Sequence, residues 1–142
     1  MSQTVLIVDD VEIIRALVEA TLGNDERRQV LTAKDGMEAL RIAAQQELDL
    51  VLLDILMPNI DGYEVCRRLK SDPATSPTEV IMLTALAKDD DRMKAMEAGA
   101  YDYLTKPFSP TQLLDKVEEV LAASPSHSSL SQKSTAMSTY GG

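Results

Sequence analysis

Three aspartates stand where apolar segments of the sequence end. Asp9 and Asp10 follow the run Val5–Val8, and Asp54 follows the run Leu50–Leu53. Carboxylates gathered in one place repel each other, so at least one should have a raised pKa unless a cation lies among them. Oxygen ligands of this kind suit Mg²⁺, which usually takes one or two carboxylates, several waters and a phosphate oxygen. An aspartate can also act as a nucleophile and form an aspartyl-phosphate.

Two more polar residues follow apolar runs later in the chain. Thr84 comes after Val80–Leu83 and offers a hydroxyl group, and Lys106 comes just after Tyr101–Leu104 and precedes Pro107. Acids, a divalent cation, a lysine and a hydroxyl together suit phosphoryl transfer, in which catalysis is mostly positioning and charge neutralisation. Taken singly, each residue has an ordinary explanation as a cap, a loop residue or a strand residue. Their joint placement at successive strand ends favours a site.

These residues can meet only if the apolar runs are strands of one sheet. Five short runs alternate with stretches of helical periodicity, and they cover Val5–Val8, Val30–Ala33, Leu50–Leu53, Val80–Leu83 and Tyr101–Leu104. The alternation predicts an α/β fold, a doubly wound three-layer sandwich around a parallel five-stranded sheet. The first, third and fourth runs are apolar throughout, as in strands covered on both faces. The mixed second and fifth runs are expected at the sheet edges.

The helix boundaries are marked by capping residues. Asp35, Asp61 and Ser109 each precede a Glu or Gln by three positions, so we expect each to cap a helix with that residue as its reciprocal partner. Pro110 suits the first position of the last helix because its missing N–H has no intrahelical partner there. Glycines at 23 and 99 mark helix ends. In such a sheet, ligands bind beyond the carboxyl ends of the strands, where the polar residues stand.

Four segments resemble the receiver domain of bacterial two-component response regulators, the CheY-like superfamily. They read VLIVDD from Val5, LVLLDILMPNIDGYE from Leu50, VIMLTA from Val80 and AGAYDYLTKPF from Ala98. The resemblance covers about residues 3–122, and the order and spacing of the motifs are highly specific. It implies a flavodoxin-like (βα)₅ fold with strand order 2-1-3-4-5.

The resemblance also implies a role for each site residue. Asp54 would be the phosphoacceptor. Asp10 and Asp54 would supply side-chain oxygens to Mg²⁺, or to Mn²⁺ in its place, with Asp9 acting directly or through water. The backbone carbonyl of Leu56 would complete the protein ligands of the metal.

Three further residues match positions that sense the phosphoryl group in this family. Thr84 would contact the phosphoryl group and Lys106 would pair with its charge. Tyr103 matches the switch aromatic, whose ring would enter the space that Thr84 leaves. The bond between Lys106 and Pro107 matches one that is cis in the family.

The partners implied by the resemblance are those of a phosphorelay. A sensor histidine kinase or a phosphotransfer protein would donate the phosphoryl group, and the face formed by the fourth helix, fifth strand and fifth helix would change. That face would serve an output domain or effector whose identity the sequence leaves open, and it is a candidate homodimer interface. The charged segment Ala87–Gly99 on this face is explained either as a solvated helix or as a surface that selects partners.

Composition indicates where the folded domain ends, and it argues against a nucleic-acid-binding or membrane-spanning protein. The chain of 142 residues has a formal net charge of −9, which argues against direct nucleic-acid contact. No apolar run is long enough to cross a membrane, and a single cysteine, Cys66, favours the cytoplasm. We expect residues 1–123 to form the receiver domain. The Ser-rich segment 124–142 is expected to be a disordered tail or a linker.

Two other functions remain open beside the signalling switch. The first is an enzyme, a phosphatase with an aspartyl nucleophile on a similar fold. Such enzymes usually carry a second acid two residues after the nucleophile, where this chain has Leu56, so we expect promotion of the domain's own phosphorylation and dephosphorylation only. The second is a receiver-like interaction domain that is never phosphorylated, against which the complete set of site residues argues.

Leucines flank the expected phosphoryl position on two sides. Leu56 lies two residues after Asp54, and Leu86 lies two residues after Thr84. Neither side chain can orient an attacking water molecule. We therefore expect slower spontaneous loss of the phosphoryl group than in a Leu56→Asn/Leu86→Glu variant.

Overall fold

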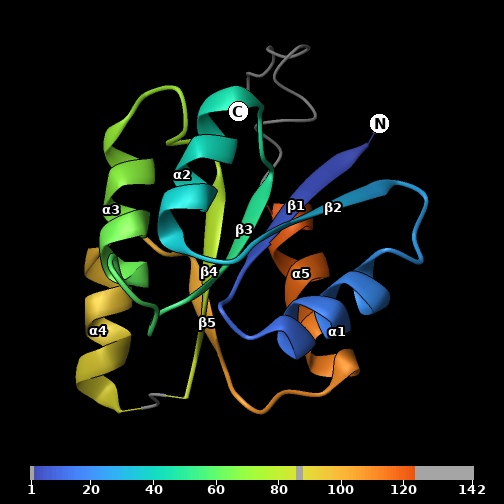
Figure 1. The fold of residues 1–142 in the computed structure, drawn as a ribbon. Coiled ribbons are helices and arrows are strands. Elements are labelled where there is room, and N and C mark those ends of the chain that lie inside the picture. The colour runs from blue at the N-terminus through green and yellow to red at the C-terminus, as the bar shows by residue number, and fades with distance from the viewer. Residues whose placement is uncertain (1, 86–87, 124–142) are drawn as a thin grey trace, which may run out of the picture.

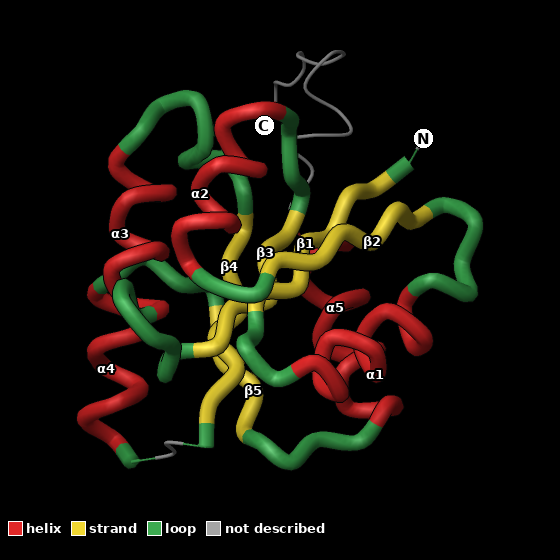
Figure 2. The backbone as a smooth tube through the Cα atoms, viewed as in Figure 1, coloured by secondary structure: helices red, strands yellow, loops and turns green. Residues whose placement is uncertain are grey.

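A five-stranded parallel sheet lies at the centre of the molecule. The structure is a computed structural model that describes residues 2–85 and 88–123. The strands are β1 (Gln3–Val8), β2 (Arg28–Ala33), β3 (Leu50–Asp54), β4 (Glu79–Thr84) and β5 (Asp102–Thr105). Their order is β2-β1-β3-β4-β5, and every neighbouring pair is parallel. The strands are drawn in yellow in Figure 2. The predicted strand order is therefore confirmed.

Five helices cover the two faces of this sheet. They are α1 (Glu12–Leu22), α2 (Gly36–Gln45), α3 (Gly62–Ser71), α4 (Asp89–Glu97) and α5 (Pro110–Ala123). Helices α2, α3 and α4 lie on one side, and α1 and α5 lie on the other (Figure 1). The predicted α/β sandwich is confirmed. No helix in the described part of the chain is long and apolar enough to cross a membrane.

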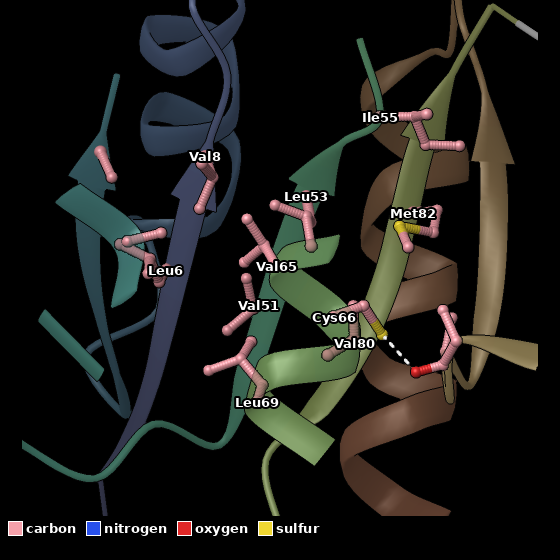
Figure 3. Close-up of a cluster of buried hydrophobic side chains, with 14 of the residues drawn as sticks. Leu6, Val8, Val51, Leu53, Ile55, Val65, Cys66, Leu69, Val80 and Met82 are labelled. Atoms are coloured by element: carbon pink, nitrogen blue, oxygen red, sulfur yellow. Dashed lines mark hydrogen bonds between the residues drawn. The ribbon is translucent and has the colours of Figure 1, made fainter. Parts of the chain in front are cut away.

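Alternate residues of the inner strands point to opposite faces of the sheet and form two cores. Leu6, Val51 and Met82 belong to the core under α2, α3 and α4, part of which Figure 3 shows. The other core lies under α1 and α5 and takes the strand residues in between, such as Ile7 and Leu52. Because both faces are buried, the middle residues of these strands are apolar on both faces. This explains the continuous runs in the sequence.

The strands β1, β2 and β4 begin one or two residues before their apolar runs, whereas β3 begins with its run at Leu50. Gln3, Arg28 and Glu79 open their strands although their side chains are polar. These residues pair with the neighbouring strands through the backbone, so their polar side chains leave no apolar pattern in the sequence, and the Arg28 guanidinium instead pairs with Asp25 and Glu118. The strand β5 begins at Asp102 rather than at Tyr101, and β2 and β5 are the edge strands as predicted.

All three expected capping side chains accept a hydrogen bond from the expected backbone N–H, but only one pair is reciprocal. Asp35 accepts from Glu38, Asp61 from Glu64, and Ser109 from Gln112. The Gln112 side chain accepts in return from the Ser109 N–H at 2.8 Å, which completes a capping box.

The reciprocal contacts predicted for the two glutamates are wrong. The Glu38 carboxylate accepts instead from the N–H of Lys34, one residue before the cap. The Glu64 carboxylate faces Arg67 and Arg68 at 3.0 Å each on the next turn. A nearby guanidinium competes for a carboxylate with a backbone N–H because its charge strengthens the hydrogen bond.

Cys66 lies in the interior on α3, where the thiol contacts the chain beyond α4. Its side chain is fully buried, and Sγ lies 3.3 Å from the carbonyl oxygen of Ala98 (Figure 3). Burial raises the pKa of the Cys66 thiol to about 11. A protonated, buried thiol is a poor nucleophile, so Cys66 has a packing role.

Candidate functional site

The predicted site residues meet at the carboxyl edge of the sheet because the strand register brings them there. Val8 pairs with Leu53, so Asp9 and Asp54 are the next residues on the two neighbouring strands. Asp54 pairs with Leu83, which places Thr84 one position further along β4. Thr84 pairs with Thr105, and Lys106 follows. Four strands thus deliver polar groups to one place, as the sequence predicts.

The three aspartates form one acidic cluster. One carboxylate oxygen from each of Asp9, Asp10 and Asp54 lies within 4.8 Å of the other two. Asp9 is fully buried, Asp54 is 6% exposed, and Asp10 is exposed. Two of the charges therefore lie in the protein interior, while the third faces the solvent from which a cation would enter.

Lys106 is the cation that the chain itself supplies to this cluster. Its Nζ lies 2.7 Å from Oδ2 of Asp9 and 3.4 Å from Oδ1 of Asp54. Burial by itself lowers the pKa of Lys106, but the hydrogen bond to Asp9 and the charge of Asp54 raise it overall above its usual value. The lysine is therefore charged at neutral pH. It lies closer to Asp9 than to Asp54.

Asp54 is the residue whose ionisation is most opposed by its surroundings. Burial and the negative charge of Asp9 raise the pKa of Asp54 from 3.8 to about 6, although Lys106 acts in the opposite direction. The sequence predicts that one of the clustered acids has such a raised pKa, and this prediction is confirmed. Perturbed acids of this kind are concentrated at functional sites.

The donor set of the cluster fits a hard divalent cation. The described residues offer carboxylate oxygens only, with no thiol or imidazole among them, and this is the set that Mg²⁺ prefers. Three acids against one lysine leave a net negative charge, which a divalent cation would balance. Asp9, Asp10 and Asp54 are the side chains that would hold it.

The remaining predicted residues lie around this cluster. Thr84 is 2% exposed at the end of β4, and the bond between Lys106 and Pro107 is cis, as the resemblance implies. Leu56, two residues after Asp54, is 60% exposed. Leu86, predicted to flank the phosphoryl position from the other side, lies outside the described residues, as does the segment 124–142.

Tyr103 is half-buried and is held by α4. The guanidinium of Arg92 lies over its ring, 4.7 Å from the centroid. Tyr103 pairs with Met82 on β4, two residues before Thr84, and packs against the core under α2, α3 and α4. The expected switch ring therefore lies between the strand that carries Thr84 and the exposed face of α4.

One contact at the site involves a residue that the sequence analysis does not single out. Nη1 of Arg15, on α1, lies 2.6 Å from the backbone carbonyl oxygen of Asp9, to which it donates a hydrogen bond. The only signal in the sequence is a basic residue near the start of a helix, and the helix dipole disfavours a cation there.

Comparison with known proteins supports the same conclusion. The sequence profile of the response regulator receiver domain matches residues 5–118. The response regulator PleD of Caulobacter vibrioides is 44% identical over 120 residues, which are 84% of this chain and 26% of PleD. The alkaline phosphatase synthesis transcriptional regulatory protein PhoP of Bacillus subtilis is 40% identical over 124 residues, which are 87% of this chain and 50% of PhoP. The chain thus spans a quarter to a half of these curated relatives.

Solved structures of separate domains match almost over their full length. A putative response regulator from Chloroflexus aurantiacus has 37% identity and a TM-score of 0.80, covering 86% of this chain and 99% of that one. The chemotaxis protein CheY4 of Vibrio cholerae has 32% identity and a TM-score of 0.80, covering 84% and 99%. With the sheet order, the acidic cluster and the profile in agreement, the chain belongs to the response regulator receiver domain family of two-component signalling proteins.

Proposed function

We propose that this chain is a phosphorylation-dependent signalling switch with Asp54 as the phosphoacceptor. The donor is the phosphohistidine of a sensor histidine kinase or of a phosphotransfer protein. The observation that carries the proposal is the position of Asp54, a buried acid within 4.8 Å of two other carboxylates and 3.4 Å from Lys106. Four strands converge to build this arrangement, which has no evident structural purpose.

The transfer itself requires little covalent chemistry from the protein. A carboxylate oxygen of Asp54 forms a bond to phosphorus while the bond from phosphorus to the histidine nitrogen breaks. The imidazole keeps that electron pair and takes up a proton. Bound Mg²⁺ supplies positive charge next to the phosphoryl oxygens. Lys106 would add a second positive charge, and the Thr84 hydroxyl would donate to a phosphoryl oxygen.

We propose that this activity is limited to the domain's own aspartate. A phosphatase acting on an external substrate would need a second acid near Asp54 that protonates the leaving group and then activates water. Leu56 occupies the position two residues further on, and its exposed side chain has no ionisable group. The phosphorylated Asp54 therefore lasts as a signal instead of turning over rapidly.

The output of the switch is expected on the face of α4, β5 and α5. Once Asp54 is phosphorylated, Thr84 moves toward the phosphoryl oxygens, and the ring of Tyr103 moves inward behind it. Arg92 contacts that ring, so the change reaches α4. A shift from 1:99 to 99:1 in favour of the active form requires about 5.5 kcal/mol of differential interaction. Charge-assisted hydrogen bonds made only in the active form are the source of this energy.

The downstream partner is proposed to be another domain or a separate protein. The relatives PleD and PhoP are two to four times longer than their matched region, and PhoP is described as a transcriptional regulatory protein. The net charge of −9 disfavours direct nucleic-acid contact by this chain. Any contact with DNA is therefore assigned to an attached or associated output domain.

Incubation with Mg²⁺ and acetyl phosphate, followed by intact-protein mass spectrometry, tests the proposal. We expect the mass of one phosphoryl group to be added to the wild-type chain and to be absent when Mg²⁺ is chelated. Asp54→Asn should stay unmodified. Asp115→Asn, an exposed acid on α5, is the matched control and should be modified like the wild type.

Two other results would each favour another function. Continuous release of phosphate in large excess over protein would show an enzyme with an external substrate. An unmodified wild-type chain, tested with both acetyl phosphate and a phosphorylated histidine kinase, would show an interaction domain that is not phosphorylated.

A further inference from the structure

Arg15 reaches from α1 back to the turn that carries two of the acids. It is the fourth residue of the helix Glu12–Leu22 and is half-buried. Its Nη1 donates to the backbone carbonyl oxygen of Asp9 at 2.6 Å. The contact is made to the backbone and not to a carboxylate, although the acidic cluster lies next to it. A guanidinium forms stronger pairs with acids than with a carbonyl, so the direction of this contact is set by the position of the side chain.

The other polar groups of Asp9 are also engaged. The Asp9 N–H donates to the carbonyl of Ala33 at 3.2 Å, Oδ1 accepts from the Val11 N–H at 2.9 Å, and Oδ2 accepts from Lys106 at 2.7 Å. Asp9 is therefore fixed through its backbone and its side chain. Asp10, the next residue, is exposed at the mouth of the site.

The carbonyl that Arg15 holds belongs to the peptide group that joins Asp9 to Asp10. A peptide group is planar, so fixing the direction of its C=O also fixes the N–H and the Cα of the following residue. The Arg15 contact thereby restrains the direction in which the Asp10 side chain leaves the backbone. This matters most for Asp10 because it is the exposed member of the cluster.

Electrostatics by itself would not place a cation at this position. Arg15 lies near the amino end of α1, where the helix dipole disfavours positive charge. It also lies beside a site whose donor set suits a divalent cation, which its charge repels. The charge of Arg15 weakens cation binding. If Arg15 strengthens cation binding overall, it must do so by holding the ligands in the right geometry.

We propose that Arg15 is a positioning residue for the acidic site. Its guanidinium holds the peptide group between Asp9 and Asp10, and so holds the Asp10 carboxylate ready to bind a divalent cation together with Asp54. The inference rests on the proposed function in one respect, that the cluster binds Mg²⁺. Beyond that function, Arg15 is a residue on α1 that does not bind the cation itself but raises the affinity of the site for it.

Calorimetric titration of the metal-free protein with Mg²⁺ at neutral pH tests the role of Arg15. Arg15→Met keeps the length of the apolar stem and removes both the charge and the hydrogen bond. We expect its Kd for Mg²⁺ to rise about 10-fold, as for other residues that orient metal ligands. Arg15→Lys keeps the charge and one donor and should bind with intermediate affinity. Arg41→Met, on the exposed face of α2, is the matched control and should bind like the wild type.

The direction of the change separates positioning from charge. Tighter or unchanged Mg²⁺ binding by Arg15→Met would overturn the inference, because loss of a positive charge alone strengthens cation binding. Thermal unfolding without metal shows whether each variant is folded. If Arg15→Met does not fold, the Kd of Arg15→Lys for Mg²⁺ is the test instead. A Kd equal to that of the wild type would then overturn the inference. A wild-type chain that fails to bind Mg²⁺ would overturn both the inference and the proposed metal site, whereas normal binding by every variant would overturn only the inference.

Discussion

At the scale of single residues, Asp54 is an acid whose ionised form is disfavoured by its surroundings. The carboxylate is 6% exposed, and burial and Asp9 raise its pKa to about 6. Lys106 lies closer to Asp9, at 2.7 Å, than to Asp54, at 3.4 Å. Asp54, the proposed phosphoacceptor, is therefore the less closely paired of the two buried acids. The Asp54 carboxylate therefore keeps more of its capacity to bind a cation than the Asp9 carboxylate does.

This arrangement predicts that Asp54→Asn stabilises the metal-free protein at neutral pH. A carboxyl group with a pKa raised from 3.8 to about 6 stabilises the fold below pH 3.8, and this stabilisation is lost as the pH rises through 6. Two pKa units correspond to roughly 3 kcal/mol as an upper bound. We expect urea unfolding to show the largest gain for the variant near pH 7, shrinking toward pH 4.

The control for this prediction is the loss of an acidic charge elsewhere. Asp115→Asn, on the exposed face of α5, makes the same change in net charge without removing a buried acid. It should change the free energy of unfolding much less than Asp54→Asn does. The interpretation of Asp54 is wrong if Asp54→Asn is less stable than the wild type at pH 7.

At the scale of elements, α4 is the helix with the weakest hold on the core. Ala95 is its only buried residue among Asp89–Glu97, and its first turn carries three aspartates. Two aromatic contacts hold its amino-terminal half. The hydroxyl of Tyr63 on α3 donates to the carbonyl of Asp91 at 3.3 Å, and the ring of Tyr103 on β5 lies under Arg92. A helix with few buried contacts can be repositioned at low energetic cost.

We predict that Tyr63→Phe loosens α4 without unfolding the domain. The lost hydrogen bond is worth about 0.5–1.5 kcal/mol, which corresponds to roughly 2- to 10-fold faster opening of this helix. Hydrogen–deuterium exchange should show faster exchange in the segment Asp89–Glu97, with β1 and β3 unchanged. Tyr101→Phe, a partly exposed tyrosine just beyond α4, is the matched control. Uniform acceleration across the whole domain would contradict a local role for Tyr63.

At the scale of the whole molecule, the two sides of the sheet carry different exposed groups. Met93 and Met96 are each 58% exposed on α4, whereas Ile13 is 73% exposed on α1 on the other side of the sheet (Figure 1). Exposed methionines adapt to varied partner surfaces because the side chain is flexible and polarisable. Helix α4, part of the proposed output face, therefore combines a single buried residue with two exposed methionines.

If this face forms a homodimer, phosphorylation should promote the dimer, and Met96→Asp should prevent it. Sedimentation velocity of the acetyl phosphate-treated chain is expected to show a dimer for the wild type and a monomer for the variant, since a charge would be buried without a partner. Mass spectrometry confirms that both are phosphorylated. Ile13→Asp, on the other side of the sheet, should dimerise like the wild type. If the phosphorylated wild type stays monomeric, the homodimer is wrong and this face would serve a different partner.

The sequence by itself determined the strand runs, the edge strands and the acids at the carboxyl edge. These follow from local patterns, since strands buried on both faces are apolar throughout and a polar residue after each run must lie at its end. The strand order came from the resemblance, whereas the presence of Lys106 at the site followed from its place after the fifth run, and the structure agrees with both.

Only the tertiary structure decided which partner each side chain takes. It shows that Lys106 prefers Asp9 to Asp54, that Arg15 holds the Asp9 carbonyl, and that Arg92 covers Tyr103. It also shows that Glu38 and Glu64 do not complete their capping boxes, because other donors lie within reach. Each outcome is a competition among several donors or acceptors at similar distances. For Lys106 the two distances differ by less than an ångström, and such differences are set by the packing of segments far apart in the chain.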